Sequence, residues 1–406
     1  MTITEIQGPG DFDDSVFANS MGDEVRDPYA ALAAAREATP VLAVPNALDP
    51  SGPPAFAVHR HADITRVLRD NAVFSSSVLQ STMGPAMGDR ILVGMDEPRH
   101  RVQRALVSVA FRQRALGRWE DALVKRVVDN LVDGFVADGH AELVRQFNFS
   151  FPTQVIAAVL GLPADDYQRF RRWALAINSL YRDWERGVTA SRELRAYLGE
   201  IIEERRRHRG DDVISDLVRA EVDGERLDDE DIFSFIGLLM PAGIETTFHF
   251  AGNLTYLLLT HPDQLAAVRA DPGLMPQAIE EGLRFEPPLL LTTRIALSDT
   301  EVGGVAVPAG SLVSPMLGAG NRDPRVYADP DRFDIFRDPR QLISFGYGVH
   351  VCLGMHLARM ETRVAVGGLI ARLPGLRLDH DAAQAADAHI HGQIFRTPTL
   401  LPVLWD

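Results

Sequence analysis

The sequence contains one cysteine, Cys352, among its 406 residues. A single cysteine cannot form an internal disulfide, so the fold depends on its apolar core. Hydrophobic residues make up 46% of the chain, which is sufficient for a large core. The chain has no repeat, low-complexity tract or linker-like segment, and we expect residues 1–406 to form one domain.

Long apolar runs and an N-terminal leader are also absent. Uninterrupted apolar stretches, such as residues 155–162, are far shorter than the roughly 20 residues that span a bilayer. The N-terminal residues MTITEIQGPGDFDD lack the basic start and the apolar run of a signal peptide. We therefore expect a soluble, cytoplasmic protein that acts as a monomer and binds no membrane.

Positive charge is in deficit, with a formal net charge of −15 and a pI of about 5.3. This balance argues against nonspecific binding to nucleic acid or to an anionic membrane. Residues 97–118 are an exception, because they are rich in arginine. Two interpretations stay open for that segment: a solvated helix face, or a basic docking patch on an acidic protein.

Helical periodicity dominates the rest of the chain. Asp229–Thr260 is predicted to be one very long helix that is apolar all round and therefore buried. A second helix is predicted over residues 356–373, after the cysteine. Strand patterns are short, and Gly303-Gly304 is typical of a hairpin turn. The predicted strands are residues 41–44, 55–58, 300–307, 312–315 and 400–404. The fold class is thus mainly α with minor β.

The segment from Ser344 to Arg359 surrounds the cysteine with Gly346, Gly348 and Gly354. Glycine permits positive φ and the close approach of another group. The segment leads into a helix whose N-terminus favours negative charge. A free cysteine is most often a small buried hydrophobe. Here the flanking pattern favours a thiolate, which as a haem ligand promotes O–O cleavage.

Phe345 to Gly354 matches F-G-x-G-x-H/R-x-C-x-G, and the chain thereby resembles the cytochrome P450 superfamily in its soluble bacterial form. The resemblance implies the P450 fold, with haem b between the long helix and the helix that follows the cysteine. It implies that Cys352 is the axial and only metal ligand and that Phe345 packs beside its sulfur. His350 would bond a haem propionate, and Gly354 would let the helix lie close to the porphyrin.

Glu281 and Arg284, at i and i+3, lie on one face of a predicted helix. An isolated pair of this kind is a weak signal. In the family, E-x-x-R is part of a buried charge network, and the resemblance implies that Arg332 is its third member. The role is structural, because buried ions need several satisfied contacts.

His100 and Arg104, at i and i+4, also share a helix face. A solvated basic helix is the simpler interpretation. The resemblance implies instead that both side chains bind the haem propionates, together with Arg294. Charge-assisted hydrogen bonds to carboxylates suit that task.

Pro241 and Gly243 disturb the middle of the long helix. A tolerated kink is one explanation. The resemblance, through A-G-x-[D/E]-T-T, implies an oxygen-binding groove in which Ala242 and Gly243 border the haem. Thr246 would be its hydrogen-bonding group and Glu245 its proton relay. Reductive cleavage of O2 needs protons, which an acid beside a hydroxyl can supply.

No flavin or nicotinamide fingerprint is present, and little sequence follows the cysteine segment, so we expect no fused reductase. Electrons from NAD(P)H are then expected to arrive through a ferredoxin and a ferredoxin reductase. Arg99, Arg101 and Arg112 are the candidate docking residues, because ferredoxins are commonly acidic and complementary charge steers association.

The expected reaction inserts one oxygen atom from O2 into a hydrophobic small molecule, by hydroxylation or epoxidation. Family position implies an apolar pocket in which Arg182 is the one candidate charged anchor. Each of these pocket side chains is equally compatible with ordinary core. The candidates are Val78, Leu79, Leu92, Leu175, Leu238, Leu290, Thr292 and Phe395.

Two other functions stay open: a peroxide-using haem-thiolate enzyme, and a non-catalytic haem protein that senses a ligand. The pair Glu245 and Thr246 favours oxygen activation, because a sensor needs no proton relay.

Overall fold

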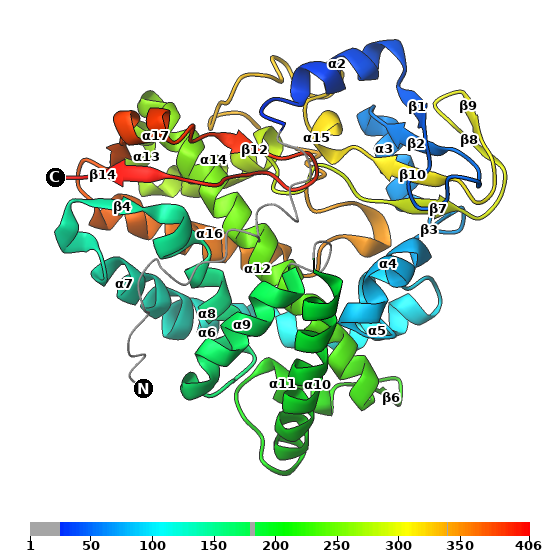
Figure 1. Ribbon diagram of the computed structural model, residues 1–406, viewed down its shortest axis with the longest axis horizontal. Coiled ribbons are helices and arrows are strands. Elements are labelled where there is room, and N and C mark those ends of the chain that lie inside the picture. The colour runs from blue at the N-terminus through cyan, green and yellow to red at the C-terminus, as the bar shows by residue number, and fades with distance from the viewer. Residues whose placement is uncertain (1–24, 179–182, 339) are drawn as a thin grey trace.

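The computed structural model describes residues 25–178, 183–338 and 340–406, and the structural statements below refer to these ranges. Helices dominate, as the sequence predicts (Figure 1). The helices are α2 (Tyr29–Ala38), α3 (His61–Arg69), α4 (Ser77–Met87), α5 (Arg99–Ser108), α6 (Gln113–Trp119), α7 (Lys125–Asp133), α8 (Ser150–Val159), α9 (Tyr167–Asn178), α10 (Trp184–Arg207), α11 (Val213–Arg219), α12 (Asp229–Thr260), α13 (Pro262–Ala270), α14 (Met275–Phe285), α15 (Leu317–Gly320), α16 (Met355–Arg372) and α17 (His380–Ala385).

The largest sheet has the strand order β1-β2-β10-β7-β3, where β1 is Val41–Val44, β2 Ala55–Val58, β10 Leu312–Pro315, β7 Arg294–Ala296 and β3 Phe74–Ser75. Only the pairing of β10 with β2 is parallel. The sheet covers a small apolar core of its own, separate from the large helical core. It matters for the site because its strand β7 begins with Arg294.

Smaller strand pairs complete the fold. The predicted hairpin is confirmed as β8 (Thr300–Val302) and β9 (Val305–Val307), whose turn residues Gly303 and Gly304 have φ of 57° and 83°. Positive φ at both positions is what a tight two-residue hairpin turn requires. The remaining strands are β4 (His140–Glu142), β5 (Glu221–Val222), β6 (Glu225–Arg226), β11 (Arg377–Leu378), β12 (Ile390–His391), β13 (Thr397–Pro398) and β14 (Pro402–Leu404).

Helix α12 has the bounds that its periodicity predicts. It begins there because the Asp228 carboxylate accepts a hydrogen bond from Asp231 N at 2.8 Å, and the Asp231 carboxylate accepts one from Asp228 N at 3.2 Å. This reciprocal cap satisfies backbone donors that a helix start leaves free. Pro241 lies inside the helix without ending it.

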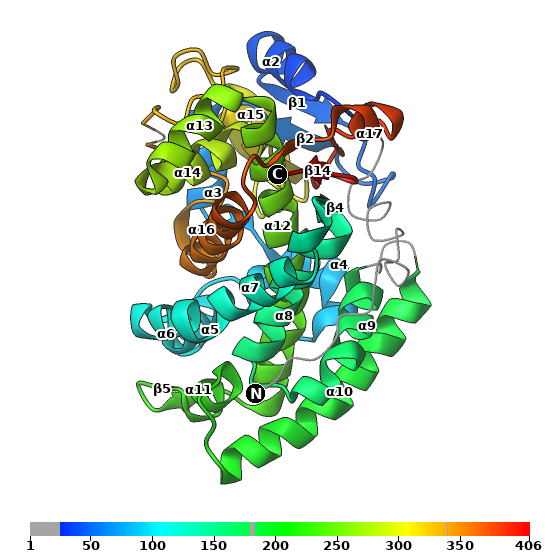
Figure 2. The same cartoon turned by 90° about the vertical axis from the view of Figure 1, so that its left-hand side faces the viewer.

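The same helix runs through the middle of the molecule, with α14 and α16 on one side and α9 and α10 on the other (Figure 2). Among the described residues, α12 alone is long and apolar enough to cross a bilayer, and 72% of its most apolar window is buried inside the protein. Its apolar surface is therefore satisfied by packing, as in the core helix of a globular protein.

Candidate functional site

The cysteine segment forms a tight loop that leads into α16. Gly346 and Gly348 have φ of 74° and 75°, and a Cβ on Gly348 would lie 2.7 Å from the carbonyl oxygen of Leu68. Glycine is therefore required at this point, both for its conformation and for its contact with α3. The Cys352 amide donates to Phe345 O at 2.9 Å and closes the loop.

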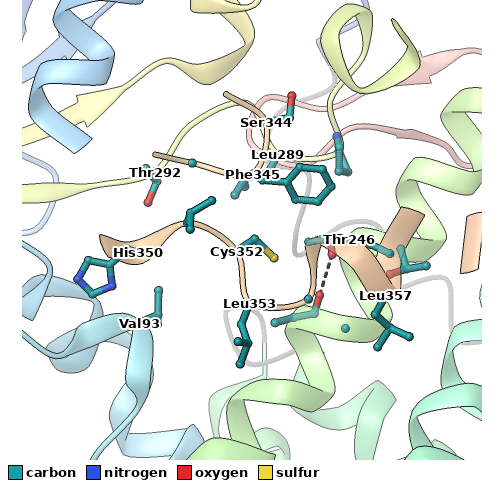
Figure 3. Close-up of a pocket in the computed structure, with 18 of the residues that line it drawn as sticks. Val93, Thr246, Leu289, Thr292, Ser344, Phe345, His350, Cys352, Leu353 and Leu357 are labelled. Carbon is teal, nitrogen blue, oxygen red and sulfur yellow. Dashed lines mark hydrogen bonds between the residues drawn. The ribbon is translucent and has the colours of Figure 1, made fainter. Parts of the chain in front are cut away.

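The Cys352 side chain is accessible, yet it is surrounded by protein, because its free surface faces an internal cavity (Figure 3). Burial raises the pKa of the thiol, while the backbone N–H of Gly354 and the positive charges of Arg104 and Arg359 lower it. The Gly354 N–H and the two arginines therefore stabilise the thiolate, which is the form of the sulfur that binds a metal. A bound metal would itself deprotonate the thiol.

One stripe of α12 opens onto the same cavity. Ala242 is exposed and Gly243 and Thr246 are half-buried, although most of the helix is buried. The Thr246 hydroxyl donates to Ala242 O at 2.7 Å. Glu245 is 8% exposed and lies outside the cavity lining, so its role as a proton relay stays a prediction.

The cavity has a volume of about 340 Å³, within the range of small-molecule sites. It is enclosed by α5, α12, α16, the cysteine loop and residues 288–294. The structure thus brings together most of the predicted site, from segments spread over the whole sequence. The predicted residues in its lining are Leu92, His100, Arg104, Leu238, Ala242, Gly243, Thr246, Thr292, Arg294, Phe345, His350, Cys352 and Gly354.

Four basic side chains gather at one side of this cavity: His100, Arg104, Arg294 and His350. The two imidazole rings lie 4.1 Å apart, and the Nε2 atom of each has no hydrogen-bond partner among the described residues. Arg104 Nη2 donates to Val351 O at 2.6 Å, and Arg294 Nη1 donates to Thr293 O at 2.8 Å.

The electrostatics of these side chains follow from their burial. Burial lowers the pKa of Arg294 to about 10, an effect that Asp96 partly opposes. Burial, reinforced by His100 and the two arginines, lowers the pKa of His350 to about 3, so this imidazole is neutral at pH 7. A bound carboxylate would restore partners to these groups.

The lining as a whole fits haem b, which is a flat apolar macrocycle with two carboxylates and a central iron. The thiol can ligate the iron, and the buried basic side chains can bind the carboxylates. The small residues Ala242 and Gly354 leave space for the flat ring, since a Cβ on Gly354 would meet only the Cys352 sulfur, at 4.0 Å, whereas a Cβ on Gly243 would meet Ile156 of α8 at 2.8 Å. Among the described residues, no cluster of His, Cys, Asp and Glu offers a competing metal site.

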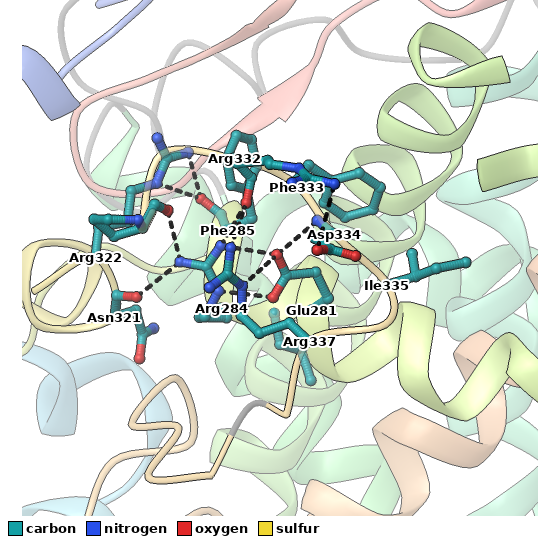
Figure 4. Close-up of polar contacts among 12 residues, drawn as sticks. Glu281, Arg284, Phe285, Asn321, Arg322, Arg332, Phe333, Asp334, Ile335 and Arg337 are labelled. Atoms are coloured by element: carbon teal, nitrogen blue, oxygen red, sulfur yellow. Dashed lines mark hydrogen bonds and ion pairs between the residues drawn. The ribbon is translucent and has the colours of Figure 1, made fainter. Parts of the chain in front are cut away.

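The E-x-x-R pair is buried as the resemblance implies. Arg284 Nε and Nη2 donate to the two Glu281 oxygens at 2.7 and 2.8 Å (Figure 4). The prediction of Arg332 as the third side chain is wrong, because that side chain is 70% exposed and lies 3.6 Å from Asp334. Arg337 takes its place, with Nε 3.3 Å from Glu281 Oε1. Arg332 contributes its carbonyl oxygen instead, which accepts from Arg284.

The prediction of Leu290 as a pocket residue is also wrong. Its neighbour Leu289 lines the cavity, while Leu290 is 1% exposed and packs against Gly318 of α15. Successive side chains of an extended segment point to opposite sides, so only one of the pair can face the cavity. The other predicted contacts outside the lining are Val78, Leu79, Leu175 and Phe395, and Arg182 lies outside the described residues.

Two residues of α16 join the site without having been predicted. Arg359 lies over the Phe345 ring at 4.4 Å and forms a two-bond ion pair with Glu280. Glu361 is 1% exposed, lines the cavity and bonds Thr247, and burial raises its pKa to about 8. Nothing in the sequence identifies Glu361, since a glutamate on a mixed helix normally faces solvent.

The proposed docking arginines Arg99, Arg101 and Arg112 are all exposed. They are not equally available to an acidic partner, because Arg99 already forms an ion pair with Asp231, with Nη2 3.6 Å from the carboxylate. His100 and Arg104 of the same helix line the cavity, so α5 has a solvent face and a cavity face, as the sequence predicts.

Comparison with known proteins gives consistent matches. The family model "Cytochrome P450" matches residues 164–374. The chain is 39% identical over 333 residues to erythromycin C-12 hydroxylase of Saccharopolyspora erythraea, covering 80% of this chain and 83% of that protein. It is 38% identical over 329 residues to cyclomarin C epoxidase CymV of Salinispora arenicola, covering 78% and 83%. The solved structure of CYP109Q5 from Chondromyces apiculatus superposes with a TM-score of 0.84 at 34% identity, covering 94% and 95%.

Proposed function

This chain belongs to the cytochrome P450 family and is a haem-dependent monooxygenase, and we propose that it hydroxylates or epoxidises a hydrophobic small molecule with electrons from a ferredoxin. One observation carries the proposal. Cys352 and the open stripe of α12 at Ala242, Gly243 and Thr246 line one cavity. A ligand that fills that cavity would therefore meet both the Cys352 thiol and the Thr246 hydroxyl.

Haem, when bound, supplies the centre at which O2 is reduced and one oxygen atom is transferred. Cys352 would ligate its iron, and His100, Arg104, Arg294 and His350 would bind its propionates. The support is that both imidazole Nε2 atoms are buried without a described partner. Such atoms normally bind something in the working protein.

Thr246 and Glu245 are proposed to handle protons. The Thr246 hydroxyl is half-buried at the cavity wall and can turn from Ala242 O to a ligand in the cavity. Glu245 precedes it and is buried, where a carboxyl can exchange protons away from bulk water.

The substrate is proposed to be bulky and hydrophobic. Much of the rest of the cavity lining is apolar, and includes Leu92, Phe235, Leu238 and Leu289. The relatives that act on erythromycin and cyclomarin C support a substrate of natural-product type. Apolar lining binds such a molecule by removing its surface from water.

The first test is the spectrum of the reduced protein with carbon monoxide, compared between the wild type and Cys352→Ser. We expect a thiolate-type spectrum in the wild type only, and a circular dichroism spectrum that is the same for both proteins, because the thiol faces a cavity. A thiolate-type spectrum in Cys352→Ser would refute the assignment, since the chain has no other cysteine.

The electron source is tested by turnover with ferredoxin, ferredoxin reductase, NAD(P)H and O2. We propose that Arg99, Arg101 and Arg112 dock the ferredoxin, so Arg101→Glu with Arg112→Glu should lower turnover by about tenfold at low salt. Arg377→Glu, a single reversal at an exposed arginine on β11, is the charge-matched control for each of the single reversals Arg101→Glu and Arg112→Glu. Turnover with peroxide but none with ferredoxin and O2 would favour a peroxide-using enzyme.

A further inference from the structure

Another buried arginine, Arg396, lies outside the cavity lining that contains the proposed haem-binding side chains. Its side chain is 2% exposed, and each of its three nitrogens donates a hydrogen bond. Nε binds the Glu286 carboxylate, Nη1 binds Val25 O at 2.9 Å and Gly392 O at 2.7 Å, and Nη2 binds Arg26 O at 2.8 Å and Ile390 O at 3.4 Å. A guanidinium has five N–H donors, and all five are used here.

Glu286 is the acidic partner and is also buried. Besides Arg396, its carboxylate accepts a hydrogen bond from the Tyr29 hydroxyl at 2.9 Å. Arg322 lies 3.7 Å from it and stacks 3.4 Å from the centre of the Tyr29 ring. The buried charges are therefore compensated, and removing one partner would leave another uncompensated.

The cluster of Arg396, Glu286 and Tyr29 holds one wall of the cavity. Between Glu286 and Arg396 the chain forms a short antiparallel ribbon, in which Arg396 N donates to Pro288 O at 3.0 Å and Leu290 N donates to Ile394 O at 2.8 Å. Leu289 sits between these two bonds, bridged to Phe395. Pro288 and Leu289 line the cavity, so the ribbon is the scaffold of that wall.

The wall is also joined to α12. Asn253, which is fully buried, donates from Nδ2 to Glu286 O at 3.2 Å and to Arg396 O at 2.9 Å. Thr246 lies seven residues earlier, two turns away along the same helix face. Helix α12, which carries the Thr246 hydroxyl that we assign to proton handling, is therefore hydrogen-bonded to the ribbon that forms the apolar wall.

We propose that Arg396, Glu286 and Tyr29 are positioning residues that set substrate selectivity, by fixing the wall formed by Pro288 and Leu289. None of the three lines the cavity, so they act through that wall and not by contact with substrate. The inference rests on the proposed function only in taking this cavity as the substrate site. It predicts that loosening the cluster changes how the cavity discriminates by size and leaves the sulfur ligand unaffected.

The experiment uses the haem-loaded protein and two probes that bind the iron from the cavity side, imidazole and 4-phenylimidazole. Dissociation constants are measured from the shift of the haem absorption band. Imidazole is too small to require the wall, whereas the phenyl group must pack against it. In Arg396→Lys, which loses most of the hydrogen bonds, we expect affinity for 4-phenylimidazole to fall about tenfold and affinity for imidazole to change less than about twofold.

Arg205→Lys is the matched control, because Arg205 is a partly buried arginine that binds Asp212 at 2.7 Å and Gly161 O at 3.0 Å, at the far end of α10. It should lower thermal stability without changing the ratio of the two affinities. Tyr29→Phe removes one hydrogen bond and keeps the ring on Arg322. It should shift the same ratio by about threefold, and it provides the test if Arg396→Lys does not fold.

An unchanged ratio in Tyr29→Phe and in folded Arg396→Lys would overturn the proposal, as would an equal loss of affinity for both probes. The proposed function fails separately, when the wild type gives no thiolate-type carbon monoxide spectrum.

Discussion

Two buried arginines, Arg284 and Arg396, hold different segments that border the same cavity. Each is paired with a glutamate, and each donates its remaining hydrogen bonds to carbonyl oxygens. Arg284 lies behind the cysteine loop. There the Ser344 hydroxyl donates to Leu283 O at 2.7 Å and accepts from Asn321 Nδ2 at 2.6 Å. Arg396 lies behind the apolar wall.

The difference lies in what each arginine supports. The segment next to Arg284 is the cysteine loop, which carries Cys352. The segment next to Arg396 is the ribbon that carries Pro288 and Leu289. The same chemistry, a buried guanidinium with all its N–H groups hydrogen-bonded, thus supports the loop of the proposed iron ligand in one place and the proposed selectivity wall in the other. Loss of the first should affect haem ligation, and loss of the second should affect selectivity.

The strongest test of this difference is Arg284→Met. It leaves the fully buried Glu281 without its two-bond partner, and we expect the free energy of unfolding to fall by about 3–5 kcal/mol. The thiolate-type carbon monoxide spectrum should weaken with it, in contrast to Arg396→Lys. Urea unfolding and the spectrum measure the two effects. Full retention of the spectrum in Arg284→Met would show that the cluster does not support the cysteine loop.

Another buried glutamate, Glu361, has no arginine partner among the described residues, and burial raises its pKa from the usual 4.5 to about 8. Below pH 4.5 the group is protonated in the folded and the unfolded state. Between pH 4.5 and 8 only the unfolded state releases the proton, so the unfolding free energy falls with rising pH, by up to ~1.4 kcal/mol per unit.

Glu361→Gln should therefore be more stable than the wild type by a few kcal/mol near pH 8 and by little near pH 4.5. Urea unfolding across this range measures the difference. A pH-independent difference would mean that Glu361 is ionised in the folded protein, with a cation that compensates it as arginine does for Glu281 and Glu286.

Thr246→Ala tests α12, the helix that Asn253 connects to the Arg396 cluster. Removing the hydroxyl should lower product formed per NAD(P)H by about tenfold or more and raise hydrogen peroxide release, because proton delivery fails. The affinity ratio for imidazole and 4-phenylimidazole should stay near the wild-type value. A changed ratio would mean that the hydroxyl also shapes the wall.

The smallest expected effects are losses of stability that decide whether Arg337 or Arg332 is the third side chain beside Glu281 and Arg284. Arg337→Ala removes an ion pair to the buried Glu281 and should cost about 1–2 kcal/mol of unfolding free energy. Arg332→Ala removes only an exposed side chain, and its cost should be below about 0.5 kcal/mol. Equal costs would restore Arg332 as a partner.

The sequence by itself determined the features whose chemistry is local. The bounds of α12 follow from periodicity and the residues of its cap. The cysteine loop, the E-x-x-R pair and the threonine of α12 are identified because each lies in a short motif that resembles one of the family's, and the residues of such a motif are neighbours in the chain. The family, the fold class and the monooxygenase activity follow from these motifs and are confirmed.

Only the tertiary structure decided which distant residues meet. Glu286 and Arg396 are separated by 110 positions, and no periodicity connects them. Leu289 and Leu290 are neighbours of the same residue type, yet only Leu289 faces the cavity. Arg332 and Arg337 are equally basic, and the course of the loop selects the second. The physical reason is the same in each case: burial and direction are set by segments that pack together from far apart in the chain, and a local pattern holds no information about them.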